Sequence, residues 1–125
     1  MVDFKQKEKY DINDLLEIMR LLRAPGGCPW DAQQTHMSIR KNLIEETYEV
    51  IEAIDKDDKE LMTEELGDLL MQVVFHAQME QEAGNFDFGD VTDGVCKKLI
   101  ERHPHVFGEV EVSGVGDVLN NWDAI

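Results

Sequence analysis

The 125-residue sequence predicts an all-α fold, a single domain over residues 1–125 built as a bundle of about five helices. Apolar residues recur at helical spacing over most of the chain. Glycine or proline stands between these periodic segments. Only the short stretch 106–112 shows any alternation typical of a strand, and 42% hydrophobic residues are enough to bury one core.

The first expected helix covers about residues 12–23, because Asp11 is a good N-cap and Pro25 stops it. Its apolar stripe consists of Ile12, Leu15, Leu16, Met19 and Leu22. The segment 26–31 follows as an expected loop, since it combines two glycines with a proline around Trp30.

Two longer helices come next. Thr35 or Ser38 opens the first, which ends near Asp55. Asp57 and Glu60 form a capping-box-like start for the second, which runs to about residue 83 and ends before glycine.

The rest of the chain is predicted to hold two further helices. One covers about residues 90–102 and ends before Pro104, because proline disfavours helix at the preceding residue. Residues 113–116 form a glycine-rich loop, after which Asp117 is expected to cap a short last helix that contains Trp122.

The two long helices carry acidic residues in unusual positions. Glu46 and Glu49 stand one turn apart on the first, and Glu65 and Asp68 one turn apart on the second. From residue 66 to 79 the second helix is apolar on nearly every side, which is typical of a central helix, so Glu65 and Asp68 are expected to point inward. A buried carboxylate needs a partner, and no Lys or Arg lies between residues 45 and 55 or between 60 and 85. A divalent cation with oxygen ligands, such as Mg²⁺, is the economical solution.

Composition excludes several classes of function. A formal charge of −15 without a basic stripe argues against nucleic-acid binding. No apolar run is long enough to span a bilayer, and the first twenty residues lack the apolar core of a signal sequence, so we expect no membrane partner and a cytoplasmic location. Cys28 and Cys96 do not form a metal-type pair and are expected to be reduced.

Several motifs together resemble one known family. They are Cys28-Pro29-Trp30-Asp31 with Gln34-Thr35, the run from Leu43 to Val50, the run from Glu65 to Leu70, Phe86-Asp87-Phe88, and Arg102-His103-Pro104-His105-Val106-Phe107. This set is similar to the MazG-like all-α nucleoside triphosphate pyrophosphohydrolases, and in particular to the first, N-terminal-type domain of MazG. The resemblance extends from about residue 15 to residue 122.

The resemblance implies hydrolysis of a nucleoside triphosphate to the monophosphate and pyrophosphate, dependent on Mg²⁺ with Mn²⁺ as a substitute. It implies four metal ligands, Glu46, Glu49, Glu65 and Asp68, with Glu45 as an auxiliary carboxylate that orients the attacking water. It also implies a homodimer, or a higher homo-oligomer, that completes a four-helix core.

Three further residues are candidates for binding the substrate. Lys98 and Arg102, one turn apart, are the cations best placed to hold a polyphosphate, and the alternative is a solvated helix face. Trp30 could stack on a base, as could Tyr48, and the alternative for each is core packing. His76 is expected to be a satisfied core histidine rather than a ligand.

A second function class stays open. Catalytic domains of this family tend to carry basic residues four positions before the acidic motifs, where this chain has Asn42 and Leu61. The alternative is therefore a catalytically weak or inactive helical domain for dimerisation or regulation, as the N-terminal part of a longer, two-domain enzyme. A di-iron carboxylate bundle is excluded because no Glu-x-x-His motif occurs.

Overall fold

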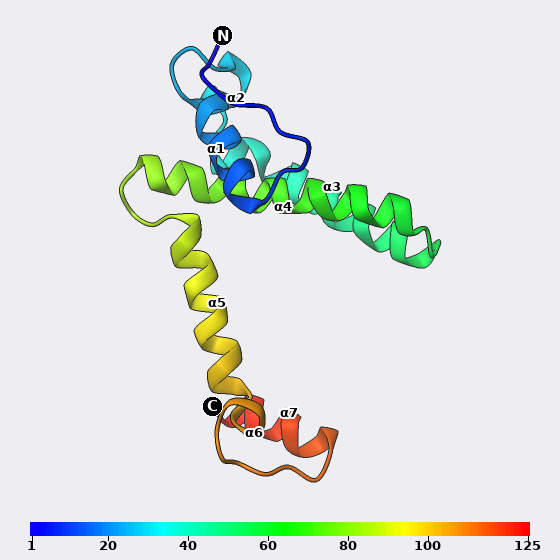
Figure 1. Cartoon of the computed structure of the whole chain (residues 1–125). Coiled ribbons are helices and arrows are strands. Elements are labelled where there is room, and N and C mark those ends of the chain that lie inside the picture. The colour runs from blue at the N-terminus through cyan, green and yellow to red at the C-terminus, as the bar shows by residue number, and fades with distance from the viewer. The chain divides into compact units, whose positions relative to one another are not determined.

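The computed structural model describes all 125 residues, and its regular structure is entirely helical (Figure 1). The chain forms two compact units, Met1–Phe88 and Gly89–Ile125. The prediction of an all-α fold is confirmed, while the number of helices is seven rather than about five, because two short helices flank the expected ones. The stretch 106–112 contains no strand. None of the helices is long and apolar enough to cross a membrane.

The first unit contains α1 (Ile12–Arg23), α2 (Pro29–Gln33), α3 (His36–Asp55) and α4 (Lys59–Glu82). The last two form a helical hairpin, because only residues 56–58 connect them and the helices contact each other along their lengths (Figure 1). Helix α1 packs against α4, and α2 packs against α1. The hairpin is therefore the scaffold for the acidic residues.

Capping side chains determine where these helices begin. Asp11 accepts a hydrogen bond from the Asp14 amide, and Thr35 accepts one from the Ser38 amide, each within a reciprocal capping box. Both starts agree with the sequence. The expected cap of α4 was wrong by one position, since Asp58 accepts from the Leu61 amide while Asp57 occupies the preceding turn with φ of 49°.

The segment 26–31 is not wholly a loop, because α2 begins at Pro29. Proline suits the first position of a helix, since its φ is already helical and its missing N–H would have no intrahelical acceptor there. Gly27 brings the chain so close to the end of α1 that a Cβ would overlap the backbone oxygens of Leu21 and Leu22. The glycines therefore turn the chain, and the proline starts a new helix.

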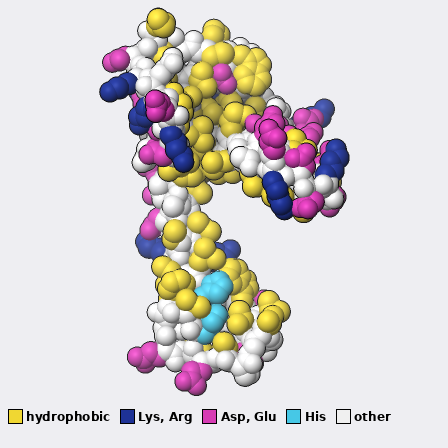
Figure 2. Space-filling model, turned by 45° about the vertical axis from the view of Figure 1, so that its right-hand side comes forward, with side chains coloured by type: hydrophobic (Ala, Val, Ile, Leu, Met, Phe, Trp, Pro, Cys, Tyr) yellow, Lys and Arg dark blue, Asp and Glu magenta, His cyan; other side chains and the backbone are white.

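The core of the first unit lies where α1, α3 and α4 meet. Its buried members are Met19, Ile39, Val74, Phe75 and Met79. In contrast, α4 is not covered on all sides within one chain, because Leu66, Leu70, Met71 and Val73 are exposed. Figure 2 shows apolar side chains gathered on a face of this unit and charged side chains at the tip of the hairpin.

The second unit contains most of α5 (Phe88–Arg102), with α6 (Pro104–Phe107) and α7 (Val115–Ala124). Arg102 joins α5 to α7, because its Nη1 donates to the Trp122 carbonyl oxygen over 2.8 Å. The start expected for α7 was wrong. The helix begins at Val115, and Asp117 instead accepts hydrogen bonds from the amide and hydroxyl of Ser113. Cys28 and Cys96 are free thiols, as expected.

Candidate metal centre

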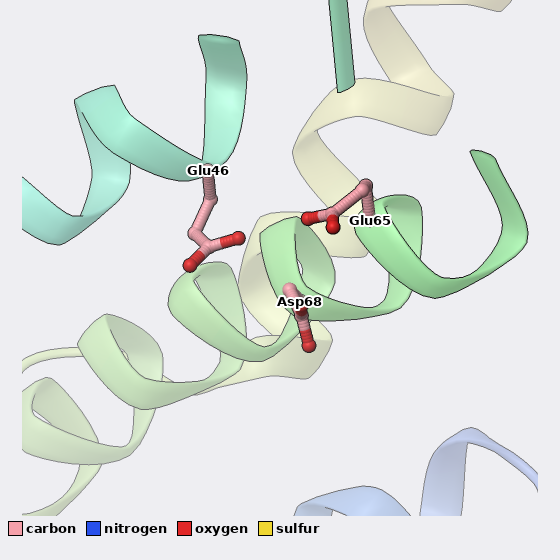
Figure 3. A group of neighbouring side chains, drawn as sticks. All are labelled: Glu46, Glu65 and Asp68. Atoms are coloured by element: carbon pink, nitrogen blue, oxygen red, sulfur yellow. The ribbon is translucent and has the colours of Figure 1, made fainter. Parts of the chain in front are cut away.

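Three acidic side chains converge across the α3–α4 hairpin. Glu46 comes from the middle of α3, and Glu65 and Asp68 come from successive turns of α4. One oxygen from each carboxylate lies within 4.8 Å of the others. In Figure 3 Glu46 and Glu65 extend toward each other from the two helices, with Asp68 beside them. All three residues are half-buried.

This cluster has no basic partner. None of the ion pairs in the chain involves Glu46, Glu65 or Asp68. Three oxygen donors so close together fit a hard divalent cation such as Mg²⁺, which binds carboxylates and completes its octahedron with water or phosphate oxygens. The residues present therefore match the group that the sequence predicts.

The electrostatics of the cluster reflect its crowding. Partial burial raises the pKa of Glu46, and the charges of Asp68, Glu49 and Glu45 raise it further, while hydrogen bonding with Glu65 acts in the opposite direction. The pKa of Glu65 is also raised, first by desolvation and then by the charges of Glu49, Asp68 and Glu46. The neighbouring charges thus disfavour the ionisation of Glu46 and Glu65, and a bound cation would relieve this repulsion.

The other two predicted acids lie at the margin of the cluster. Glu49 is exposed and does not belong to the group of three, although its charge is near enough to raise the pKa of Glu65. Glu45 is exposed too, and one of its oxygens lies 3.7 Å from the Lys41 Nζ. The structure therefore brings together three of the four predicted ligands.

The predicted substrate-binding cations lie in the second unit, on α5. Lys98 Nζ lies 5.9 Å and Arg102 Cζ 5.2 Å from the centroid of the Trp122 ring, so both cations contact the same indole. Arg102 is half-buried, which does not match a fully solvated helix face. The contribution of Trp122 was not predicted. A lone tryptophan in the last helix and two cations one turn apart were its only signal.

The predicted aromatic candidates are not buried. Trp30 lies on α2 with 55% of its surface exposed, and Tyr48 lies on α3 with 67% exposed. Core packing within one chain therefore does not account for either side chain. Both remain available to a ligand or to a second protein surface.

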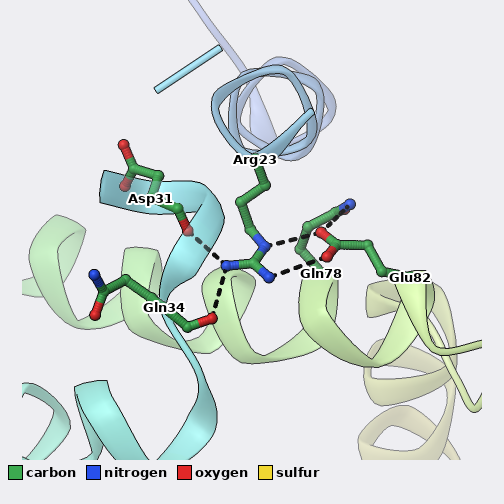
Figure 4. Close-up of polar contacts among 5 residues, drawn as sticks. All are labelled: Arg23, Asp31, Gln34, Gln78 and Glu82. Carbon is green, nitrogen blue, oxygen red and sulfur yellow. Dashed lines mark hydrogen bonds and ion pairs between the residues drawn. The ribbon is translucent and has the colours of Figure 1, made fainter. Parts of the chain in front are cut away.

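Arg23 is a structural residue that the sequence did not single out (Figure 4). Its side chain is only 8% exposed. The guanidinium donates from Nε and Nη2 to the Glu82 carboxylate, over 2.9 and 3.0 Å, and from Nη1 to the carbonyl oxygens of Asp31 and Gln34, over 2.6 and 3.1 Å. It also lies over the Phe75 ring, 5.5 Å from the centroid. Arg23 thereby ties the segment that carries Trp30 to α4.

The fold and the carboxylate cluster define a class of protein: all-α proteins in which a helical hairpin presents oxygen ligands suited to a divalent cation. A family model for the MazG nucleotide pyrophosphohydrolase domain matches residues 34–107. The chain belongs to this family. The matched range contains all five acidic residues that the sequence predicts for the site.

Similar proteins agree with this assignment. The chain is 56% identical over 96 residues to the nucleoside triphosphate pyrophosphohydrolase/pyrophosphatase MazG of Thermotoga maritima, covering 77% of this chain and 38% of that protein. It is 50% identical over 115 residues to the nucleoside triphosphate pyrophosphohydrolase of Escherichia coli K12, covering 91% of this chain and 44% of that protein. The chain thus spans less than half the length of these relatives.

A solved structure also matches over most of its length. The crystal structure of a MazG-related protein from Thermotoga maritima superposes with a TM-score of 0.73 at 29% sequence identity. The match covers 90% of this chain and 96% of that one.

Proposed function

We propose that this chain hydrolyses nucleoside triphosphates to the nucleoside monophosphate and pyrophosphate, with Mg²⁺ as cofactor and Mn²⁺ as its substitute. The observation that carries the proposal is the convergence of Glu46, Glu65 and Asp68 without any basic partner. The names of the relatives supply the substrate class.

The bound cation would neutralise charge on the phosphate oxygens and lower the pKa of a coordinated water. Glu46, Glu65 and Asp68 would hold it from the two sides of the hairpin, and Glu49, whose charge is near enough to raise the pKa of Glu65, would be the fourth ligand. Glu45 is another carboxylate near the cluster, since its charge raises the pKa of Glu46, and it would orient the attacking water by accepting a hydrogen bond. Cleavage of a phosphoanhydride depends chiefly on such positioning and charge neutralisation.

The substrate itself would be held by residues outside the cluster. On the sequence pattern alone, Lys98 and Arg102 would supply positive charge for the polyphosphate, and within the second unit both cations contact the indole of Trp122. Trp30 offers an exposed aromatic face on which a base can stack. A charge-reversing change at Arg102 is expected to raise KM more than it lowers kcat.

A second copy of the chain would cover the apolar surface of the hairpin. Four large side chains of α3 are exposed by 45–67%, and they are Ile44, Tyr48, Ile51 and Ile54. Together with the exposed apolar side chains of α4 they give the hairpin an apolar surface of the kind that marks protein–protein contact sites. We propose a homodimer formed through this hairpin. Sedimentation analysis that finds a monomer at micromolar concentration would refute it.

The test of the catalytic proposal is pyrophosphate release from a panel of nucleoside triphosphates in the presence of Mg²⁺. Activity is expected to vanish in Glu65→Gln and in Asp68→Asn, because each variant keeps the shape of the side chain and removes a ligand charge. Glu60→Gln is the matched control, since Glu60 is an exposed acid on the same helix. Activity that survives both ligand substitutions would end the proposal.

A non-catalytic role is the second candidate, and it rests on Asn42 and Leu61 standing where basic residues are usual in this family. The chain would then bind nucleotide and mediate assembly without turnover. Calorimetry distinguishes the two proposals: binding of a nucleoside triphosphate with no pyrophosphate release at any Mg²⁺ concentration favours this second role.

A further inference from the structure

Two histidines meet between α3 and α4, away from the carboxylate cluster. His36 is the first residue of α3, and His76 lies in the second half of α4. Their Nδ1 atoms are 2.6 Å apart, their ring centroids 4.9 Å apart, and their ring planes within 3° of parallel. The centroid separation is about the Nδ1–Nδ1 distance plus the two radii from ring centre to nitrogen. The rings therefore lie side by side in one plane with their Nδ1 atoms facing each other.

A carboxylate orients the outer histidine of this pair. Glu80 Oε1 lies 2.7 Å from His36 Nε2, and its other oxygen accepts a hydrogen bond from Asn85 Nδ2 over 2.8 Å. These bonds lower the pKa of Glu80, so Glu80 is the acceptor and His36 Nε2 carries a proton. In the form that a metal ligand requires, the Nδ1 lone pair of His36 faces His76. A histidine that donates one N–H to a carboxylate and presents its other nitrogen is the usual arrangement around metal ions.

The inner histidine has a nitrogen that nothing satisfies. His76 Nε2 is buried and has no hydrogen-bond partner. Burial, with a smaller effect of His36, lowers the pKa of His76, so this ring is neutral at neutral pH. Where His36 Nδ1 is the acceptor of this contact, the single proton of His76 lies on Nδ1. If that proton moves to Nε2, the two Nδ1 lone pairs face each other along one line.

The geometry points to a second cation site between the two rings, made by His36 Nδ1 and His76 Nδ1, for a borderline divalent ion such as Zn²⁺. Imidazole nitrogens suit Zn²⁺, Ni²⁺ and Cu²⁺, whereas the carboxylate cluster suits Mg²⁺. Two nitrogens on a tetrahedral ion stand about 3.3 Å apart, given metal–nitrogen bonds of about 2.0–2.1 Å, so the rings must separate by about 0.7 Å and must turn until their lone pairs meet at about 109° instead of lying on one line. His36 can make this movement because its side chain is 44% exposed, and water has access to the remaining coordination positions.

Such an ion would connect the start of α3 to α4 and would replace the direct contact between His36 Nδ1 and His76 Nδ1. It would raise the thermal midpoint of the first unit by several degrees at saturating concentration, without contact to the proposed catalytic carboxylates. Because both ligands must be neutral, protons would compete with the ion and the affinity would fall in acid.

The chain contains its own control for the effect of neighbouring histidines. His103 and His105 also lie close together, with ring centroids 5.5 Å apart, but their planes are tilted by 51°. His103 Nδ1 is already engaged with the Leu99 carbonyl oxygen over 2.6 Å. This second pair therefore presents no facing nitrogens and is not expected to bind the ion.

The experiment is calorimetric titration of the full chain with Zn²⁺ alone, in excess Mg²⁺ to occupy the carboxylate cluster. We expect one Zn²⁺ per chain, an affinity at least about 10-fold lower in Glu80→Gln, and no binding in His36→Asn, while His105→Asn binds like the parent chain. In histidine-detected NMR the ring signals of His36 and His76 should shift and those of His103 should not.

Equal Zn²⁺ affinity in the parent chain and His36→Asn would overturn the proposal. So would displacement of the bound Zn²⁺ by Mg²⁺, because that result would place the ion at the carboxylates. His36 is exposed at the first turn of its helix, so His36→Asn is expected to fold, which circular dichroism checks directly.

Discussion

Replacing Arg23 by methionine is the sharpest test of how the first unit is held together. Methionine keeps the apolar stem of the side chain and removes every hydrogen-bond donor of the guanidinium. Four hydrogen bonds are lost, two to the Glu82 carboxylate and two to the carbonyl oxygens of Asp31 and Gln34. The substitution therefore removes the hydrogen bonds through which Arg23 connects α4 to the segment that carries Trp30.

The expected loss in free energy of unfolding follows from how exposed each hydrogen-bond partner of Arg23 is. The Glu82 side chain is 40% exposed and regains water, so its two bonds together are worth about 1 kcal/mol. Each of the two carbonyl oxygens lies in a partly buried contact and loses a charged donor, at about 1 kcal/mol each. The free energy of unfolding should fall by about 3 kcal/mol in total, which for a unit of this size lowers the thermal midpoint by about 12–24 °C.

The assay is thermal unfolding followed by circular dichroism, with Arg20→Met as the matched control. Arg20 lies on the same helix and also makes two bonds to a carboxylate, Glu17, but both side chains are about half exposed. Its loss should cost about 0–0.5 kcal/mol and no more than about 4 °C. Equal destabilisation by the two substitutions would refute the reasoning that burial gives Arg23 its effect.

Three further predictions follow from the same structure. The pKa of Glu65 is raised in the folded chain, so the free energy of unfolding falls as pH rises through that pKa and Glu65 ionises. Glu65→Gln should therefore raise the thermal midpoint of the metal-free chain at pH 7 and abolish the stabilisation by Mg²⁺. A lower midpoint in this variant would contradict the repulsion among the carboxylates. Because Arg23 holds the pKa of Glu82 below its ordinary value of 4.5, the stability that this carboxylate supplies is present above that value and lost as pH falls through the lowered pKa, and an acid titration should show a smaller loss in Arg23→Met than in the parent chain. Gly27→Ala should lower the free energy of unfolding, measured by chemical denaturation, by at least about 2 kcal/mol, because the new Cβ meets backbone oxygens. Gly67→Ala should raise it by about 0.5–1 kcal/mol, because Gly67 lies within a helix and faces open space. Similar effects at both positions would show that the close approach at Gly27 is unimportant.

Helix positions could be read from the sequence wherever the signal was local. Helix α1 begins after Asp11, as predicted, and α3 begins after Thr35, one of its two predicted starts, because a cap acts on amides only two or three residues away. The errors also have local causes. Asp57 and Asp58 are both good caps, and only the turn between α3 and α4 decided that Asp58 takes this role.

The acidic spacing likewise identified the candidate site, because residues three apart on a helix share a face. The sequence could not decide which acids meet. That depends on how α3 and α4 rotate against each other, and this rotation brings Glu46, Glu65 and Asp68 together while Glu49 stays outside.

The sequence alone thus determined the helical class, most helix boundaries, the family and the two acidic motifs. Only the tertiary structure decided three contacts: the convergence of three carboxylates, the ties of Arg23 to Glu82 and two carbonyls, and the facing rings of His36 and His76. The physical reason is the distance along the chain over which each interaction acts. Capping and periodicity act within a turn or two of helix, whereas these contacts join residues up to 59 positions apart and form only once the helices pack.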